Sequence, residues 1–516
     1  MKTMGGAYQR PGERLATARS RHESGFRLGN LSAWWVLLPV GLLAAFTAFL
    51  FDALPDVALG WDALPLMGVG ILLFAVLLVG LGSSRTRAAS AWRIGLVLWW
   101  FLLCSQEFFA RFTSQEATAL GHYAPAAYEE AIFWILILVA LSIATLGSPG
   151  YLGSIVSGRY GWLTLYVILC AASTVLSVNH LFSLAWAFKL GLVVLVIQLL
   201  SSQMHSYDDL RSLLRVTLWA FAFLAIVPTL QSFLNPAQAF GEGGRLGGLL
   251  APDEQSALSG VLILLLLALY SESRLRWPVL LGGIGVATMV MSGGKTGIVA
   301  AMFSGTAFYL LQKKFRPAIG LLIGFVLVGL PLYLFTPFGG YLQRYMQSGE
   351  ASTFTGRTPL WQVAISGIFQ RPVLGHGFAA SQFMANQLVD LPFAATNAHN
   401  GFLEALYNNG LVGLILILLI LGYTARNLWK AAKEPSDLPG YPQLAAGLIA
   451  VFLDLLINGM VAGSFAGRVR ADFVMLLGMV VISEVMVRFK AERARAGSLP
   501  SGLLNEPSND WVETRP

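Results

Sequence analysis

The sequence predicts an all-α, polytopic integral membrane protein, and three observations support this prediction. Hydrophobic residues make up 56% of the 516 residues, and charged residues make up only 12%, compared with about 25% in soluble proteins. Long apolar stretches recur along the chain, as membrane-spanning helices require. The net charge of +7 is scattered over short loops and two tails. A scattered charge gives no continuous basic surface, so we expect no nucleic-acid partner.

We expect about twelve to fourteen membrane-spanning helices, because a span needs about 17–25 mainly apolar residues. The expected number is a range because the apolar stretches near 277–312 are short for a span. The candidate spans are residues 31–51, 65–82, 94–110, 131–147, 161–179, 184–201, 213–234, 256–271, 277–293, 297–312, 317–336, 410–426, 443–461 and 471–487.

The basic residues predict the orientation of these spans. If the N-terminus is cytoplasmic, most of the 34 basic residues fall on the cytoplasmic side, as the positive-inside rule requires. The nine on the other side are Arg111, Lys189, Arg245, Lys295, Arg344, Arg357, Arg371, Arg468 and Arg470. Both tails are then cytoplasmic, and the longest loop faces outward.

This orientation divides the chain into five expected segments. A basic cytoplasmic tail (1–30) precedes a transmembrane bundle (31–335). A large outward loop (336–409) follows, and then the C-terminal transmembrane helices (410–487). The last segment (488–516) is polar, ends in a stretch containing Pro, Gly and Ser, and is expected to be a disordered cytoplasmic tail.

The outward loop is expected to contain short helices. Thr358 is a suitable cap and Pro359 a suitable first residue for an amphipathic helix that lies at the membrane surface, and Pro372 ends it. Gly375–Phe378 reads as a tight turn, and residues 379–388 as a second helix. The apolar residues at helical spacing in the first helix are Leu360, Trp361, Ala364, Ile365, Ile368 and Phe369.

His399 is the candidate for chemistry in this loop. The helical pattern resumes there and runs into the span at Gly410, which places His399 about three turns before the span and near the membrane boundary. An unperturbed imidazole has a pKa of about 6.5, so it is largely neutral near pH 7 and can accept a proton. The alternative is an interfacial polar anchor. His376, between two glycines, is expected to be structural, and His180 to lie near the outer end of a span.

Two further outward segments each present one cation beside glycines. Arg245 lies in the loop 241–248, and Lys295 lies in the turn 291–297. Cations next to exposed backbone N–H groups suit a phosphate or pyrophosphate. The alternatives are a solvated loop charge for Arg245 and a snorkelling helix anchor for Lys295. The run Gly293–Thr296 lacks the spacing of a nucleotide-binding P-loop and a preceding strand, so we exclude that class.

Charged residues inside the spans are few. Asp454 lies deep in a span and should have a partner or line a polar cavity, since an isolated charge there is costly. Lys189 is expected near the outer end of its span. Cys104 and Cys170 lie in apolar runs without paired spacing, so neither a disulfide nor a zinc site is expected. No outward Asp-x-Asp pair is present, and we expect neither a metal nor a cofactor.

Taken in order, these motifs resemble those of the O-antigen ligase/polymerase superfamily of bacterial inner-membrane proteins, over about residues 160–480. The matching motifs are Gly244-Arg245, Ser292-Gly293-x-Lys295-Thr296, Gly356-Arg357-x-x-x-Trp361, Arg371-Pro372-x-Leu374-Gly375-x-Gly377, and His399-Asn400 followed after nine residues by Gly410-x-x-Gly413. Two positions depart from the family pattern: Lys295 stands where an Arg is usual, and Leu414-Ile415 where the ligase type has Thr-Thr. The expected spans also exceed the usual number by about two.

The resemblance implies a GT-C-like glycosyltransferase whose donor is a glycan on undecaprenyl pyrophosphate at the outer face of the inner membrane. It implies His399 as the general base that deprotonates an acceptor hydroxyl, with Arg245 and Lys295 neutralising the leaving pyrophosphate. Further candidates for substrate binding are Arg357, Asn400, Glu404 and Asp454. The spacing of Glu404 from His399 points its side chain away on a helix. The implied partners are a glycan or glycolipid acceptor, membrane lipids and other polysaccharide-assembly proteins.

Three functions remain open from the sequence. A polymerase would extend O-antigen or exopolysaccharide repeat units, and the two departures favour it. A ligase would transfer a finished glycan to lipid A–core or to protein. A polytopic transporter or flippase would need charged residues through the membrane, for which only Asp454 and Lys189 qualify.

Overall fold

The computed structural model describes residues 100, 103–104, 160–204, 206–240, 245–247, 250–270, 276–335, 357–387, 398–433, 438–461, 467 and 469–498. The four spans expected between 31 and 147 lie outside these residues, apart from Trp100, Leu103 and Cys104. The total number of spans therefore stays a prediction.

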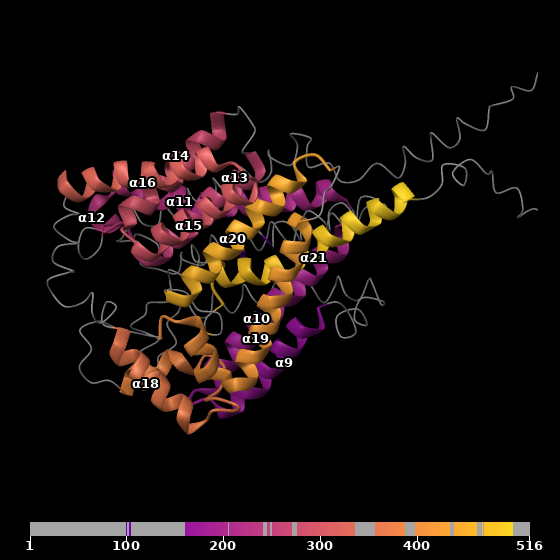
Figure 1. The fold of residues 1–516 in the computed structure, drawn as a ribbon. Helices are drawn as coiled ribbons and strands as arrows, with labels where there is room; N and C mark the ends of the chain where they lie inside the picture. Colours follow the sequence, from indigo (N-terminus) through magenta and orange to yellow (C-terminus); the bar gives the residue numbers. More distant parts are fainter. Residues whose placement is uncertain are drawn as a thin grey trace, which may run out of the picture.

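The described residues form helices, and the only strand-type pairing among them is an isolated bridge between Phe240 and Leu246. The helices in chain order are α9 (Gly161–Ser173), η1 (Thr174–Leu176), α10 (His180–Gln203), α11 (Tyr207–Leu234), α12 (Pro236–Ala239), α13 (Pro252–Tyr270), α14 (Arg276–Ser292), α15 (Lys295–Leu311), α16 (Phe315–Phe335), α18 (Arg357–Gln370), η3 (Ala380–Gln387), α19 (Gly401–Lys433), α20 (Tyr441–Val461) and α21 (Ala471–Ser498) (Figure 1).

Each span predicted after residue 160 coincides with one of these helices. In the described part of the chain, five helices are long and apolar enough to cross a membrane: α10, α11, α13, α19 and α20. The apolar parts of α9 with η1, α14, α15 and α16 are shorter. These findings confirm the predicted class, a polytopic all-α membrane protein.

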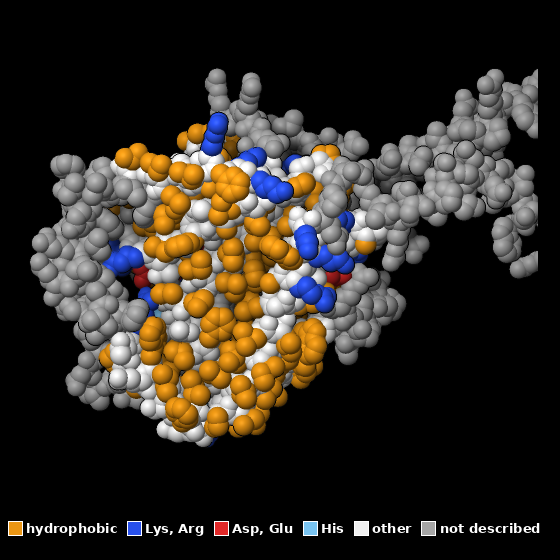
Figure 2. Space-filling view, in the orientation of Figure 1, with side chains coloured by type: hydrophobic (Ala, Val, Ile, Leu, Met, Phe, Trp, Pro, Cys, Tyr) orange, Lys and Arg blue, Asp and Glu red, His pale blue; other side chains and the backbone are white. Residues whose placement is uncertain are grey.

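The long helices share one apolar core. α13 lies at its centre and packs against α11, α14, α15 and α20. α16 packs on α15 at the edge and leaves apolar side chains such as Leu327 exposed. Figure 2 shows hydrophobic side chains across the middle of the visible face, with Lys and Arg at its borders. This distribution fits a surface that contacts lipid.

Within this core, α11 contains a proline that the neighbouring helix compensates. Pro228 has no N–H, so it cannot donate to the carbonyl of Leu224 one turn earlier. The side-chain amide of Gln255 in α13 donates to that carbonyl at 2.8 Å and is itself fully buried. Since an unpaired backbone group inside a membrane is costly, Gln255 stabilises the junction of α11 and α13.

The ends of several helices meet at one end of the bundle, which we call the α18 end. It holds the starts of α13, α15, α19 and α21 and the ends of α14 and α20, joined by bonds such as Leu246 N–H to the Met291 carbonyl at 2.9 Å. The opposite end is fixed by contacts such as Arg488 Nη2 to the Met204 carbonyl at 2.7 Å. The predicted outward residues Arg245, Lys295, Arg357 and Arg470 all lie at the α18 end.

Four local predictions need correction. The segment predicted as a second loop helix is a 3-10 helix, η3, at Ala380–Gln387. The helix after His399 does not run evenly into the span, because α19 is interrupted at Gly410. α18 begins at Arg357, one residue before the expected cap. α21 continues to Ser498, so residues 488–498 are helical rather than part of a disordered tail. Their Ala, Glu and Arg content favours a helix.

Candidate functional site

Asp253, in the first turn of α13, is the centre of a cluster of ion pairs at the α18 end. Its Oδ1 atom lies 2.6 Å from Nη2 of Arg245. Arg245 also donates from Nε to the Ser292 carbonyl at 3.0 Å and from Nη2 to the Gly293 carbonyl at 3.4 Å. The turn after α14 therefore holds one side of the Arg245 guanidinium, and Asp253 contacts it from α13.

Arg357 brings the predicted outward loop into the same cluster. It is the first residue of α18, and its Nη2 atom lies 3.9 Å from Oδ2 of Asp253. Its Nη1 atom donates to the carbonyl of Val461, the last residue of α20. Arg357 is largely buried, whereas Asp253 keeps 41% of its side-chain surface exposed. Two guanidinium groups from distant parts of the chain thus share one accessible carboxylate.

Lys295 lies beside the same turn of α13. It is the first residue of α15, directly after Gly294, whose carbonyl accepts from the Ser256 hydroxyl at 2.9 Å. Gly294 packs closely on α13, because a Cβ built there would lie 3.2 Å from the Cα of Asp253. The backbone of Lys295 therefore lies beside the turn of α13 at which Arg245 and Arg357 meet Asp253.

The sequence reasoning did not single out Asp253 or its neighbour Glu254. Glu254 forms an ion pair with Nη1 of Arg470, and Asp472 contacts Nε of Arg470 at 3.4 Å. Acidic residues in the first turn of a helix are a recognisable pattern, and they complement the positive end of the helix dipole. That pattern marks the start of α13 but does not reveal which cations these residues meet.

α18 also positions the segment that carries His399. The indole Nε1 of Trp361 donates to the Ala398 carbonyl at 2.9 Å. His399 follows directly and has a positive φ of 48°, an unusual backbone conformation for a residue with a side chain. Arg357 and Trp361 are four residues apart, about 6 Å along the helix axis. One short helix therefore fixes both the cation cluster and the His399 segment.

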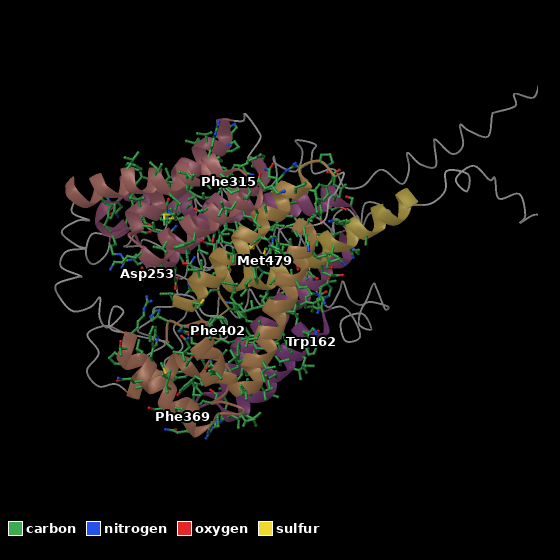
Figure 3. All side chains as sticks on the ribbon, viewed as in Figure 1. Trp162, Asp253, Phe315, Phe369, Phe402 and Met479 are labelled. Atoms are coloured by element: carbon green, nitrogen blue, oxygen red, sulfur yellow. The ribbon has the colours of Figure 1, made fainter. Side chains whose placement is uncertain are left out.

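Asn400 caps α19. Its Oδ1 atom accepts from the N–H groups of Phe402 and Leu403, both at 3.1 Å. This cap accounts for the Asn type at the position and gives Asn400 a structural role beside the predicted substrate contact. Glu404 is fully buried in the first turn of α19. In Figure 3, Asp253 lies on the side of the α13–α15 group that faces α18 and the labelled Phe402 of α19.

The segment 371–377 packs on the segment of α19 that contains Gly410 and Gly413. Gly410 interrupts α19 with φ 61° and ψ −162°, and a Cβ there would collide with the Val373 carbonyl. On either side of the interruption, His376 N–H donates to the Tyr407 carbonyl at 2.8 Å and Leu411 N–H to the Pro372 carbonyl at 2.8 Å. The predicted tight turn is thus a clamp around the interruption in α19. These motifs hold the site together.

Two further histidines in the described part of the chain, His376 and His180, make structural contacts. His376 stacks on Tyr407 with centroids 4.5 Å apart, and its Nε2 donates to the Gly367 carbonyl at 2.8 Å. The expectation that His376 is structural is confirmed. At the start of α10, His180 donates from Nδ1 to the Thr174 carbonyl at 3.0 Å.

Asp454 and Lys189, the two residues singled out within predicted spans, lie away from the cluster. Asp454 is fully buried in α20 and accepts from Nδ2 of Asn458 at 3.2 Å. It faces Gly260 of α13 and lies seven residues, about 10 Å along the helix, before Val461. Lys189 lies inside α10 rather than near its end, buried, with Nζ 4.4 Å from the centroid of Trp186. The expected position of Lys189 at an outer end is therefore wrong.

Within the described ranges, no group of three or more His, Cys, Asp or Glu side chains is arranged to hold a metal ion. Cys104 and Cys170 are free and buried, so no disulfide joins them. Independence from metals and cofactors stays a prediction.

The fold and the site define a polytopic helical membrane protein with an arginine cluster and a histidine-bearing segment at one end. Residues 259–418 match the O-antigen ligase family. This range includes Lys295, Arg357 and His399, whereas Arg245 and Asp253 precede it. One curated relative, the exopolysaccharide production protein ExoQ of Rhizobium meliloti (strain 1021), is 35% identical over 81 residues.

That alignment covers 14% of this chain and 19% of the relative, so the chain matches about a fifth of the relative's length. The two comparisons together confirm the predicted resemblance to the O-antigen ligase/polymerase superfamily.

Proposed function

We propose that the protein is a glycosyltransferase that moves a glycan from undecaprenyl pyrophosphate to an acceptor sugar. The observation that carries this proposal is the double contact of α18. Its Arg357 pairs with Asp253 beside Arg245, and its Trp361 holds the segment before His399. A general base and cations for a leaving pyrophosphate are the groups that such a transfer needs.

In the proposed reaction, neutral His399 accepts the proton of the acceptor hydroxyl. The acceptor oxygen forms a bond to the anomeric carbon of the donor, and the bond from that carbon to the phosphate oxygen breaks. Arg245, Arg357 and Lys295 neutralise the undecaprenyl pyrophosphate as it leaves. The donor is already activated, so the transfer requires no nucleoside triphosphate. The buried positions of Glu404 and Asp454 support packing roles more than the substrate contacts predicted from the sequence.

Among the possible acceptors, we favour another lipid-linked repeat unit, which makes the protein a polymerase. The departures at Lys295 and Leu414-Ile415 support this choice, as does similarity to a protein named for exopolysaccharide production. The matching family is described as O-antigen ligase, which supports transfer to lipid A–core or protein as the second candidate. A transporter is less favoured, because Asp454 and Lys189 have Asn458 and Trp186 as neighbours inside the bundle.

We further propose that the protein lies in the bacterial inner membrane with the α18 end facing outward. The positive-inside distribution supports cytoplasmic tails. This orientation would expose His399 and the cation cluster to a lipid-linked donor on the outer face. Other polysaccharide-assembly proteins would supply that donor and accept the product.

The catalytic assignment is tested by His399→Gln in proteoliposomes that contain a lipid-linked donor and acceptor. Loss of a general base should lower the transfer rate by about 100-fold or more, without loss of folded protein. His180→Gln is the matched control, since it makes the same change at a histidine with a structural hydrogen bond. Full activity of His399→Gln would refute the assignment.

A deletion strain distinguishes the three functions by its glycolipids. A polymerase predicts the loss of long chains while single repeat units still reach the surface. A ligase predicts long chains that accumulate on undecaprenyl pyrophosphate. A flippase predicts repeat units that remain on the cytoplasmic side.

A further inference from the structure

Asp253 is a negatively charged residue among cations. It contacts Arg245 and Arg357, two of the residues proposed to bind pyrophosphate. Its Oδ1 lies 2.6 Å from Arg245 and its Oδ2 lies 3.9 Å from Arg357. A carboxylate and a phosphate accept the same kind of charge-assisted bond from a guanidinium. Asp253 therefore occupies the place where an oxygen of a diphosphate would bind both arginines.

The arginines do not depend on Asp253 alone for their position. Arg245 is held by the carbonyls of Ser292 and Gly293, and Arg357 by the carbonyl of Val461. These bonds come from backbone carbonyls at the end of α14, in the turn after it and at the end of α20, not from α13. Both cations would thus keep an anchor if the carboxylate moved aside.

Asp253 is also accessible to solvent. Its side chain is 41% exposed, about twice as exposed as that of Arg245 at 21%, and the pair is therefore partly screened by water. Rotation about its side-chain bonds would place the carboxylate in solvent without a change in α13. A polyanion with more charge than one carboxylate can then displace it.

We propose that Asp253 is a displaceable carboxylate that competes with the diphosphate of the donor and product for Arg245 and Arg357. This inference rests on the proposed function, since it assumes that these arginines bind the diphosphate. The leaving undecaprenyl pyrophosphate gains a negative charge when its bond to the sugar breaks, so the arginines hold it tightly. When Asp253 returns to both arginines, it helps to release the undecaprenyl pyrophosphate and prepares the site for the next donor.

The test compares purified full-length protein with Asp253→Asn, which keeps the shape and removes the charge. Binding of inorganic pyrophosphate and of farnesyl pyrophosphate is measured by calorimetry in detergent, with orthophosphate as a reference. Asp253→Asn should bind both diphosphates about fivefold to tenfold more tightly than the unchanged protein. A larger gain for farnesyl pyrophosphate indicates a lipid diphosphate, and an equal gain indicates the diphosphate group alone.

Glu254→Gln is the matched control, because it removes the next carboxylate of the same turn, which pairs with Arg470 instead. It should leave the affinity for both diphosphates unchanged. In steady-state transfer assays, Asp253→Asn should lower KM for the donor and lower kcat through slower product release. If Asp253 instead served only to hold the two arginines in place, Asp253→Asn would raise KM for the donor.

The result that overturns the inference is equal or weaker diphosphate binding by Asp253→Asn. The proposed function is examined separately by Arg245→Gln in the same calorimetric experiment. If Arg245→Gln weakens binding and Asp253→Asn does not strengthen it, the arginines bind diphosphate and only the competition is wrong. If Arg245→Gln binds as tightly as the unchanged protein, the proposed diphosphate site itself is wrong.

Discussion

Arg357, the first residue of α18, lies with its Nη2 atom 3.9 Å from the Oδ2 atom of Asp253 in the first turn of α13. This contact connects the predicted outward loop to the bundle of spans. Together with the bond from Arg357 to the Val461 carbonyl, it fixes the start of α18 against the ends of two long helices. The position of α18 then fixes the position of the His399 segment.

Replacing Arg357 should show whether its two contacts need a guanidinium. Arg357→Lys keeps the charge but loses the planar fork, so it cannot reach the Val461 carbonyl and Asp253 in the same way. We expect the transfer rate at low donor concentration to fall about tenfold, and further for Arg357→Ala. Arg371→Lys is the control, since Arg371 is exposed and donates only weakly to the Leu176 carbonyl at 3.3 Å. Equal activity of both lysine variants would contradict the assigned role.

Trp361→Phe should loosen the His399 segment without removing a catalytic group. The substitution keeps an aromatic ring but removes the donor to the Ala398 carbonyl. We expect kcat to fall about tenfold with little change in KM, because a poorly positioned base affects the chemical step most. Trp429→Phe makes the same change at an exposed tryptophan of α19 and should be neutral. If the two variants have the same kcat, α18 does not position His399 through this bond.

Gly410→Ala should disrupt the clamp between the 372–376 turn and α19. Gly410 has a φ of 61°, and an added Cβ would meet the Val373 carbonyl. We expect a loss of stability of about 2 kcal/mol or more, measured by thermal unfolding in detergent, and a corresponding loss of activity. Gly422→Ala tests the same change further along α19, where a Cβ would meet nothing within 4 Å. A stable, active Gly410→Ala protein would show that the interruption is not required.

Gln255→Leu should destabilise the junction of α11 and α13. The Leu224 carbonyl would lose its donor, and we expect a loss of about 1–3 kcal/mol in unfolding free energy. Pro228→Ala restores a backbone N–H in α11 that can bond to the same carbonyl. The double variant should therefore recover part of the stability lost by Gln255→Leu. Additive losses in the double variant would argue against this compensation.

The sequence predicted the helices well because membrane spans have a strong local signature. A span needs an uninterrupted apolar stretch, and each predicted stretch after residue 160 is a helix. The amphipathic helix of the loop was also predicted, since its apolar residues recur with helical spacing. The predictions failed where distant contacts decide the local conformation. Gly410 interrupts α19 because the turn at 372–376 packs against it, and neither segment alone indicates this.

The candidate site was predicted in part, because several of its residues also have a local signature in the sequence. Arg245, Lys295, Arg357 and His399 stand out as polar residues beside glycines or in a loop between spans. The sequence placed the cations on turns between spans and the base on the loop, as two halves of one site. The structure adds that Arg357 and Trp361 of one short helix contact both halves. Asp253 was missed, because an acidic residue at the start of a helix also occurs for helix stability alone.

The sequence by itself determined that this chain is a polytopic helical protein, which residues lie at one end of its spans, and which superfamily its motifs resemble. Hydrophobic spacing and charge distribution are local properties, so one sequence is enough to show them. Only the tertiary structure decided that Asp253 joins Arg245 to Arg357 and that α18 carries both Arg357 and the support for His399. Arg357 and Asp253 lie more than 100 positions apart, and Trp361 lies 37 positions before Ala398, so the geometry of these contacts depends on how the helices pack.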